Sequence, residues 1–413
     1  MSVPKEIVIV GGGIIGACSA YYLNRAGFQV TIVEKDEFGQ AASHGNCGLI
    51  VPSHAMPLCE PGALLKPFKS MFDSHSPFHV NPWAGPSLWG WLLRFALSCT
   101  HEKALNSARA RHEFLQSSIS LYEDLLEKEN LSVEWQKKGL LFVHTKEESF
   151  QHLGKVNDLL TKECSLSAAP YDQKAVVELE PALLDSVIGG WHYEGDAHLR
   201  PDALMSELKR VLLAKGVSIR ENTEVTKFMT EHSKVKAIKT SNGTIDCDSL
   251  VLATGALAPK LSPQLGVKLH IQPGKGYSIT TNHPNPCPKI PLILEDHAVA
   301  VTPFESGFRL GSTMEFTGYD NSINPKRMSL LEYGAKHYLR DVKGDHQEEE
   351  WAGWRPMSHN DLPVVSRTPG IQNAWVAAGH SMLGISLGPA TGKLLTEMIC
   401  GDQPHIDPSP YQL

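Results

Sequence analysis

Three glycines near the start of the chain, Gly11, Gly13 and Gly16, have the spacing of a loop that binds the phosphates of a dinucleotide. The apolar stretch Ile7–Val10 precedes them and is predicted to be a strand. Gly11 permits a tight turn, Gly13 lets the backbone approach a pyrophosphate, and Gly16 lets the following helix pack on the strand. The amino end of that helix would offer free N–H groups and a positive dipole end to the phosphates.

An acidic residue, Glu34, ends the second predicted strand of this unit, Val30–Val33. It lies about twenty residues after the first glycine, which is the spacing of the acid that binds a ribose. Its carboxylate would accept hydrogen bonds from ribose hydroxyls and would repel a 2′-phosphate. The motif therefore favours FAD or NAD over NADP. The sequence contains one such motif, which favours an enzyme that takes electrons directly from an organic substrate.

The composition is that of a globular enzyme. The 413 residues suffice for two or three domains, and the net charge of −7 argues against binding to nucleic acid. The eight cysteines form no Cys-x-x-Cys pair, so we expect no metal site, and scattered thiols indicate a reducing compartment. The amino terminus has no pattern of a secretory signal, so we expect a cytoplasmic enzyme.

The remaining predicted elements alternate between two kinds of sheet. A helix over Pro201–Lys215, a buried strand over Ser249–Thr254 and a helix over Pro389–Met398 suit a doubly wound nucleotide-binding fold. Residues 269–316 alternate as an antiparallel sheet does, and residues 102–129 have the spacing of one or two amphipathic helices. We predict an α/β protein in which a doubly wound, Rossmann-like domain is interleaved with a mostly antiparallel α+β substrate domain. The first domain would comprise residues 1–56, 200–265 and 352–413, and the second residues 57–199 and 266–351.

An apolar and aromatic segment, Leu88–Leu97, contains a single charged residue, Arg94. One interpretation is a helix that faces the core. The other is a patch that touches a membrane surface or a partner. Prolines at positions 77, 82 and 86 exclude a membrane-spanning helix over residues 74–93.

Several further segments carry recognisable patterns: Ala42–Ile50, Asp196-Ala197 with Arg200-Pro201, Pro273–Ser278 with Arg309–Glu315, and Trp351–Pro356 with Pro363–Val365, Ala377–His380 and Gly384-Ile385. Together with the glycine motif, they resemble the FAD-dependent D-amino acid oxidase/glycine oxidase superfamily, and within it most of all the bacterial D-amino acid dehydrogenases. The resemblance spans almost the whole chain. It implies that the first domain binds FAD, and we expect this binding to be tight and noncovalent.

The resemblance also implies a set of site residues. In this superfamily the arginine of the W-x-G-x-R-P pattern binds the substrate carboxylate, which assigns that role to Arg355; a guanidinium can direct two N–H donors to a carboxylate. The alternative for Arg355 is a structural ion pair. Tyr277 is a candidate pocket residue or a core aromatic, and His380 is a candidate catalytic residue that faces the flavin or a packing residue. The expected cofactor contacts are Gly11, Gly13, Ile14, Ile15, Gly16, Glu34, Lys35, Ala42, Ser43, Asn46, Cys47, Gly48, Leu49, Val225, Ala253, Thr254, Gly255, Gly379, His380, Gly384 and Ile385.

The implied reaction is the oxidation of a D-amino acid. A hydride leaves Cα for flavin N5, and water hydrolyses the imino acid to a 2-oxo acid and ammonia, unless the amine is secondary and cyclic. Met382 and Leu383 predict an apolar pocket, which favours larger or cyclic substrates such as D-proline or a hydroxyproline. The length and aromatic content of Pro52–Leu97 favour transfer of the electrons to a quinone or an electron carrier, with peripheral contact to the inner membrane. The alternatives are a glycine/sarcosine-type oxidase that uses oxygen, and a flavin-bound RNA-modifying protein.

Overall fold

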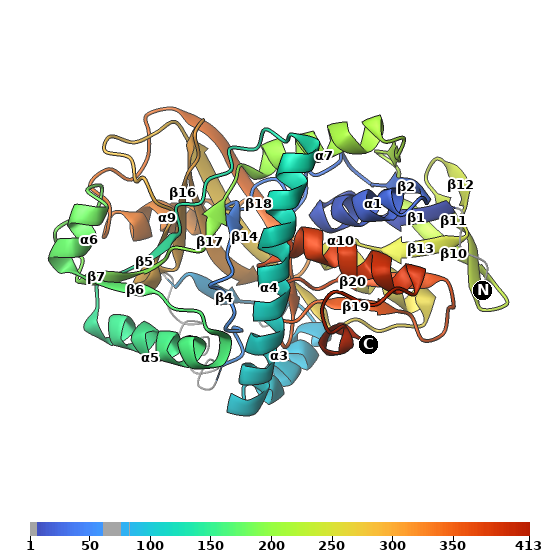
Figure 1. Cartoon of the computed structure of the whole chain (residues 1–413), viewed down its shortest axis with the longest axis horizontal. Coiled ribbons are helices and arrows are strands. Elements are labelled where there is room, and N and C mark those ends of the chain that lie inside the picture. Colours follow the sequence, from blue (N-terminus) through green and yellow to red (C-terminus); the bar gives the residue numbers. More distant parts are fainter. Residues whose placement is uncertain (1–5, 61–75, 82) are drawn as a thin grey trace.

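A computed structural model of the chain describes residues 6–60, 76–81 and 83–413. In this part, a six-stranded and a nine-stranded sheet lie side by side, and the long helix α4 (His101–Glu129) runs between them (Figure 1). Residues 1–5, 61–75 and 82, which belong to the predicted domains and partly to the segment Pro52–Leu97, lie outside the described residues.

The six-stranded sheet has the glycine motif at its centre. All of its strands are parallel except β19, which pairs antiparallel with β20. Across the sheet, the order is β19 (Val364–Arg367), β20 (Ala374–Ala378), β13 (Ser249–Leu252), β1 (Glu6–Val10), β2 (Gln29–Val33) and β9 (Ser218–Arg220).

Different elements cover the two faces of this sheet. Successive side chains of a strand point to opposite faces, so Ile7 and Ile9 of β1 pack in the core under the helices, whereas Val8 and Val10 pack in a second core under a small sheet. The helices are α1 (Ile14–Arg25), α7 (Pro201–Ala214) and α10 (Gly384–Cys400); the small sheet consists of β10 (Val225–Glu231), β11 (Lys234–Thr240) and β12 (Gly243–Asp246).

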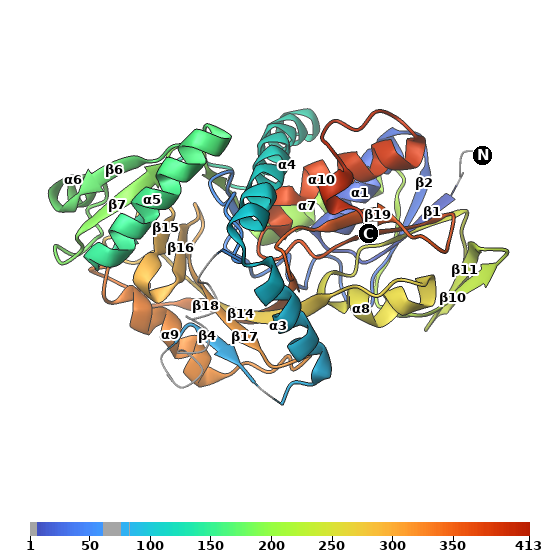
Figure 2. The ribbon, with the colours of Figure 1, turned by 90° about the horizontal axis from the view of Figure 1, so that it is seen from below.

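The nine-stranded sheet forms the other half of the molecule and is mostly antiparallel. Its order is β18 (Gln347–Ser358), β14 (Ile271–Thr281), β17 (Phe308–Phe316), β16 (Val299–Pro303), β15 (Leu292–Leu294), β5 (Leu140–His144), β7 (Gly189–Tyr193) and β6 (Ala169–Asp172), and β4 (Phe78–Val80) pairs with β17. The helices α5 (Glu147–Cys164), α6 (Gln173–Leu179) and α9 (Pro325–Ala335) lie in this half (Figure 2). A separate antiparallel pair consists of β3 (Leu49–Ile50) and β8 (Ala197–His198).

The two sheets are built from alternating stretches of the chain. The six-stranded sheet takes its strands from residues 6–33, 218–252 and 364–378, and the nine-stranded sheet takes its strands from the stretches between them. The predicted fold class, an interleaved α/β protein, is confirmed. The exact domain boundaries stay a prediction.

The sequence predicted one or two helices over residues 102–129 and a last helix that starts at Pro389. Residues 102–129 lie in one helix, α4. The predicted start of the last helix at Pro389 is wrong, because α10 begins at Gly384 and contains Pro389 in its interior. Proline is commonest at the first position of a helix, but inside a helix it lacks the N–H that would reach the carbonyl four residues earlier. That carbonyl, of Ile385, instead accepts a hydrogen bond from the Tyr122 hydroxyl of α4 at 2.6 Å.

Helix α3 (Pro86–Ser98) forms where the sequence predicts one. Leu88 and Trp91 are buried, whereas Trp89, Leu93 and Leu97 are exposed. In the part of the chain that the structure describes, no helix is long and apolar enough to cross a membrane.

Replacing Tyr122 with phenylalanine should lower the free energy of unfolding by about 1–3 kcal/mol, because it leaves the buried Ile385 carbonyl without its donor. Denaturant unfolding would measure this loss. The control is Tyr171→Phe, which should change stability by less than about 0.5 kcal/mol because Tyr171 is only half-buried. Equal losses in the two variants would contradict the role assigned to Tyr122.

Candidate active site

The glycine turn packs closely against the end of β13, the strand that pairs with β1. Gly11 has φ +113°, and a Cβ on it would collide with the carbonyl oxygen of Ala253. A Cβ on Gly16 would collide with the carbonyl oxygen of Gly11. The turn therefore requires glycine at both positions, as the dinucleotide motif predicts.

The amino end of helix α1 lies directly above this turn. Gly13 is its cap residue, and no side chain caps it from that position. The N–H of Ile14 donates to Ser43 Oγ at 2.9 Å, and Ile15 follows in the first turn. Thr254 Oγ1, just after β13, is buried and has no hydrogen-bond partner in the described part of the chain. A helix amino end without a side-chain cap at Gly13 and an unpaired hydroxyl fit the phosphate groups of a dinucleotide.

The acid predicted to bind a ribose is held in place by the backbone. Glu34 accepts hydrogen bonds from the N–H groups of Gly12 at 2.7 Å and Asp36 at 3.1 Å. Its own carbonyl oxygen accepts from Thr223, two residues before Val225, so β10 begins beside the end of β2. Lys35, the predicted cofactor contact next to Glu34, forms an ion pair with Asp36, and its side chain is partly exposed.

Residues 42–49 form a loop between the two sheets, and the nine-stranded sheet holds one side of it. The Arg309 guanidinium donates to the carbonyl oxygens of Asn46 at 2.7 Å and His44 at 3.2 Å. The Ser278 hydroxyl donates to the carbonyl oxygen of Gly45 at 2.7 Å. The sheet therefore supplies the donors that these loop carbonyls need.

The other end of the loop reaches the amino end of α10. Thr302 of β16 donates to the Cys47 carbonyl oxygen at 2.7 Å, and Ser386 of α10 donates to the Leu49 carbonyl oxygen at 2.8 Å. The predicted contacts Gly384 and Ile385 are the first two residues of α10. The loop is thereby fixed between β16 and the start of α10.

The side chain of Asn46 closes the loop on itself. Its amide nitrogen donates to the carbonyl oxygens of Ala42 at 3.2 Å and Ser43 at 3.1 Å, and its amide oxygen accepts from the N–H of Gly48 at 2.8 Å. The conformation that presents residues 42–48 is therefore set by these bonds as well as by the surrounding sheet.

Arg355 lies on the face of the nine-stranded sheet that meets this loop. It pairs in register with Gly274 of β14, and a Cβ on Gly276 would collide with its guanidinium. Its Nη1 donates to the Thr313 carbonyl oxygen at 2.8 Å. Among the described residues, no carboxylate lies within ion-pair distance of Arg355. Burial lowers the pKa of this guanidinium, while Cys47 opposes the shift.

Tyr277 lies on the opposite face of β14 from Gly274 and Gly276. Its side chain is buried in the core of the nine-stranded sheet, and its hydroxyl donates to Glu315 at 2.9 Å. Burial and the Glu315 carboxylate raise the pKa of Tyr277. The structure thus does not bring Tyr277 to the face that carries Arg355, and its placement matches the core aromatic that the sequence also allowed.

The loop that contains His380 is tied to the strand that carries Arg355. The N–H of Ser381 donates to the carbonyl oxygen of Pro356 at 3.0 Å. His380 itself is buried, and its Nε2 lies 3.0 Å from Thr391 Oγ1. Burial lowers the pKa of His380 to about 3, so the imidazole is neutral at physiological pH. Gly379 precedes it at the end of β20.

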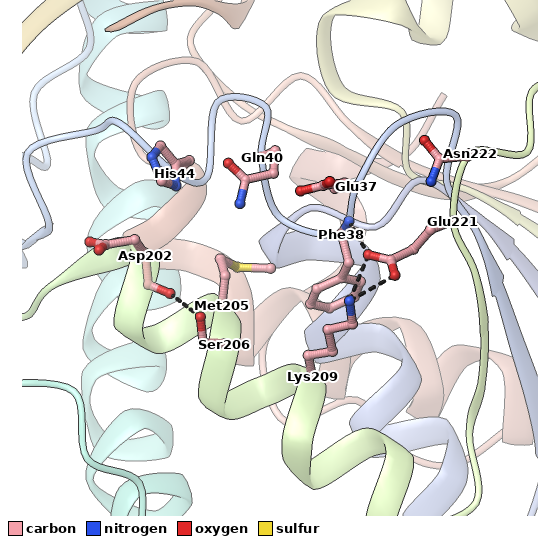
Figure 3. A pocket seen from close by; sticks show the side chains of 10 residues that line it. All are labelled: Glu37, Phe38, Gln40, His44, Asp202, Met205, Ser206, Lys209, Glu221 and Asn222. Carbon is pink, nitrogen blue, oxygen red and sulfur yellow. Dashed lines mark hydrogen bonds and ion pairs between the residues drawn. The ribbon is translucent and has the colours of Figure 1, made fainter. Parts of the chain in front are cut away.

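A separate polar pocket of about 520 Å³ lies beside the segment that follows β2 (Figure 3). In it, Lys209 of α7 contacts both carboxylate oxygens of Glu221 at 2.7 Å, and the N–H of Phe38 donates to the same carboxylate. None of the residues predicted to contact cofactor or substrate lines this pocket. Its central charges are already paired with one another.

Sequence reasoning assigned no role to Arg309 or Ser278, although both hold the loop. A signal for Arg309 was available: an arginine stands inside the otherwise apolar and small stretch Phe308–Gly311 of a predicted strand. A buried charge needs partners, which here are the carbonyl oxygens of the loop.

The chain is similar to known proteins along its whole length. The sequence profile of the family described as DAO, FAD dependent oxidoreductase, matches residues 6–398. A D-amino acid dehydrogenase of Paramagnetospirillum magneticum is 32% identical and covers 96% of this chain and 95% of its own length. A D-amino acid dehydrogenase of Agrobacterium fabrum is 28% identical, with 97% of each chain covered. Glycine oxidase from Geobacillus kaustophilus has the same fold, with a TM-score of 0.79, 22% identity and coverage of 99% and 98% of the two chains.

Replacing Gly13 with valine should prevent FAD from binding, because the added side chain occupies the approach to the amino end of α1. A Cβ there lies 3.1 Å from Ser43 Oγ, a side chain that can yield, so the protein should still fold. The measurement is flavin absorbance per mole of purified protein, with circular dichroism to confirm folding.

The matched control is Gly370→Val. A Cβ on Gly370 meets no atom within 4 Å, and this variant should bind FAD as the wild type does. A Gly13→Val protein that retains full flavin absorbance would contradict the assignment of the glycine turn.

Proposed function

Since the chain belongs to the DAO family of FAD-dependent oxidoreductases, we propose that it acts as a D-amino acid dehydrogenase. The observation that carries this proposal is Arg355, a half-buried guanidinium without a carboxylate partner in the described part of the chain. The dehydrogenases that are 28–32% identical over almost the full length support it.

Arg355 is the anchor for the substrate in this proposal. Arginine keeps its charge at physiological pH, and a buried charge without a counter-ion is costly. A substrate carboxylate would supply the counter-ion and accept two parallel N–H bonds. Gly276 leaves the space that the guanidinium occupies, and the Thr313 carbonyl fixes its orientation.

The residues around the glycine turn would hold FAD. Gly11, Gly13 and the amino end of α1 would hold the pyrophosphate, Glu34 a ribose, and Val225 the adenine. The loop 46–49 and the residues from Gly379 to Ile385 would line the ring. When bound, FAD supplies the acceptor for the hydride that leaves the substrate Cα.

The remaining chemistry requires position more than proton transfer by the protein. The thiol of Cys47 lies near Arg355, and burial raises its pKa, so it keeps its proton. His380 is neutral and is held by Thr391. The substrate amine must be neutral before hydride transfer, and a desolvated position beside a cation favours its neutral form. Residues of the site therefore orient the substrate and exclude water.

The proposal extends to substrates and surroundings. Met382 and Leu383, in the loop beside Pro356, support apolar and cyclic substrates such as D-proline or a hydroxyproline. We propose a quinone or an electron carrier as acceptor. A cytoplasmic location, with peripheral contact to the inner membrane, suits eight cysteines that are all free thiols.

Replacing Arg355 with leucine should lower kcat/KM for D-amino acids roughly thirty- to a thousandfold. This loss corresponds to an activation free energy that is higher by about 2–4 kcal/mol. FAD should stay bound, because Arg355 lies on β18 of the nine-stranded sheet, whereas the glycine turn lies between β1 and α1 of the other half. Dye-linked assays would give kcat/KM, and flavin absorbance would report the cofactor. Arg355→Lys should lose less, because it keeps the charge and loses the paired donors.

The control is Arg367→Leu, the same change at an exposed position of β19. It should leave kcat/KM within about twofold of the wild type, as expected for a surface substitution. Wild-type kinetics in an Arg355→Leu protein that binds FAD would overturn the proposed anchor.

The acceptor can be identified by reoxidation. The enzyme should be reduced without oxygen by members of a panel of D-alanine, D-proline, hydroxyproline, glycine and sarcosine, then mixed with air-saturated buffer or with a water-soluble quinone. We expect reduction by D-amino acids and reoxidation at least tenfold faster by the quinone. Rapid reoxidation by oxygen alone, with glycine or sarcosine as the best substrate, would favour an oxidase instead.

A further inference from the structure

Trp351 lies on the same face of β18 as Arg355. The two residues are four apart, and successive side chains of a strand alternate between its faces. Both are half-buried. β18 is an edge strand of the nine-stranded sheet, on the side that lies nearest the other half of the molecule (Figure 1). The structure therefore adds an aromatic side chain to the face that carries the proposed anchor.

The indole ring of Trp351 extends along the strand toward Arg355. It covers Gly353, because a Cβ on Gly353 would collide with the ring. Gly353 pairs directly with Gly276 of β14, and the place of a Cβ on Gly276 is taken by the Arg355 guanidinium. The Cβ positions of directly opposed residues are about 5 Å apart. The indole and the guanidinium therefore lie next to each other on the sheet.

The loop that the nine-stranded sheet holds contacts the same ring. A Cβ on Gly45 of this loop would collide with the Trp351 indole. Ser278, directly opposite Trp351 on β14, donates to the Gly45 carbonyl oxygen at 2.7 Å. Gly311 of β17 pairs with Ser278 in turn, and a Cβ on it would collide with the Cys47 thiol. The loop thus covers the row of the sheet from which the indole begins, and the ring ends beside the proposed anchor.

We propose that Trp351 determines substrate specificity, because its indole forms the apolar side of the substrate site. The inference rests on the proposed function, in which Arg355 binds the substrate carboxylate and the loop 46–49 lines the flavin ring. A substrate whose carboxylate is at Arg355 and whose Cα is at the flavin must span the distance between the guanidinium and the loop. The indole occupies this interval, so the carbon skeleton of the substrate packs against it.

The chemistry of an indole defines the substrates that this surface favours. Its large apolar area is removed from water by a branched or cyclic skeleton, whereas glycine would leave it uncovered. The negative face of the ring disfavours an acidic side chain. The expected order is therefore D-proline and D-valine before D-alanine, with glycine and D-glutamate last.

Contact with the flavin alone is the competing role for this ring. An indole that served only the flavin would be expected to end under the loop. The Trp351 ring instead extends past the loop to cover Gly353, beside the Arg355 guanidinium. This placement favours contact with the substrate, and the experiment below separates the two roles.

The test is a titration of the FAD-loaded enzyme with carboxylates that it cannot oxidise, followed by the change in flavin absorbance. Cyclopentanecarboxylate carries an apolar ring, and acetate carries little besides the carboxylate. Wild-type enzyme should bind cyclopentanecarboxylate about tenfold more tightly than acetate, or better. Trp351→Ala should reduce this preference to about threefold or less, and it should leave acetate binding within about twofold of the wild type, because Arg355 is intact.

The matched control is Trp354→Ala, the same change on the opposite face of β18. The Trp354 Nε1–H donates to the Asp320 carbonyl oxygen at 3.1 Å, away from the anchor, so this variant should keep the wild-type preference. Gly353→Ala is an independent variant, because its new Cβ would displace the indole and should also reduce the preference. The same Gly353→Ala change should have no further effect in the Trp351→Ala protein. Circular dichroism and flavin absorbance would confirm folding and FAD content.

In dye-linked assays, kcat/KM for D-proline relative to D-alanine should fall about tenfold in Trp351→Ala and stay unchanged in Trp354→Ala. A Trp351→Ala enzyme that keeps both FAD and the wild-type preference would overturn the role of Trp351 and leave the proposed function standing. Loss of FAD from Trp351→Ala would replace the substrate contact with a flavin contact. A wild type that oxidises no D-amino acid, but whose preference for the ring still depends on Trp351, would instead overturn the proposed function and leave this inference standing.

Discussion

The backbone carbonyls of the loop 44–49 must find donors away from water, and this requirement fixes how the two halves of the molecule meet. Buried carbonyl groups without partners are costly. Arg309, Ser278 and Thr302 supply donors from the nine-stranded sheet, and Ser386 supplies one from α10. Because the loop is bonded from both sides, its position relative to the glycine turn and to the Arg355 face is set by the same contacts. The nine-stranded sheet thus positions the site through hydrogen bonds from its side chains to the backbone of the loop.

Two arginines near this loop, the buried Arg309 and the half-buried Arg355, show how bonding partners separate a structural role from a binding role. Arg309 has donors directed to Thr280 Oγ1, to two loop carbonyls and toward Glu349, so its bonding is largely satisfied within the protein. Arg355 makes one such bond, to Thr313, and faces no carboxylate in the described residues. Arg309 therefore holds the loop in place, whereas Arg355 keeps N–H donors that can bind another group. That difference follows from partners, which neither the residue type nor its burial alone reveals.

The sequence predicted the strands around the glycine motif well. It predicted poorly those features that depend on contacts between distant parts of the chain. The strands around the glycine motif were predicted as Ile7–Val10 and Val30–Val33, within one residue of β1 and β2, because apolar runs and glycines act locally. The start of α10 was missed because Pro389 resembles a first helical residue, and the donor to the Ile385 carbonyl that an interior proline leaves unbonded is Tyr122, from a distant helix. The period of two along β14 separates Tyr277 from Gly276. It does not say which face meets the loop, because that depends on register with β18.

The short stretch 355–358 at the end of β18 connects the proposed substrate anchor with two neighbouring elements. Thr313 accepts from Arg355, Ser381 donates to Pro356, and Trp91 donates to Met357. The substrate anchor, the loop before α10 and helix α3 are thus bonded to adjacent residues of one strand. A shift of this strand would therefore move the substrate anchor, the loop before α10 and helix α3 together.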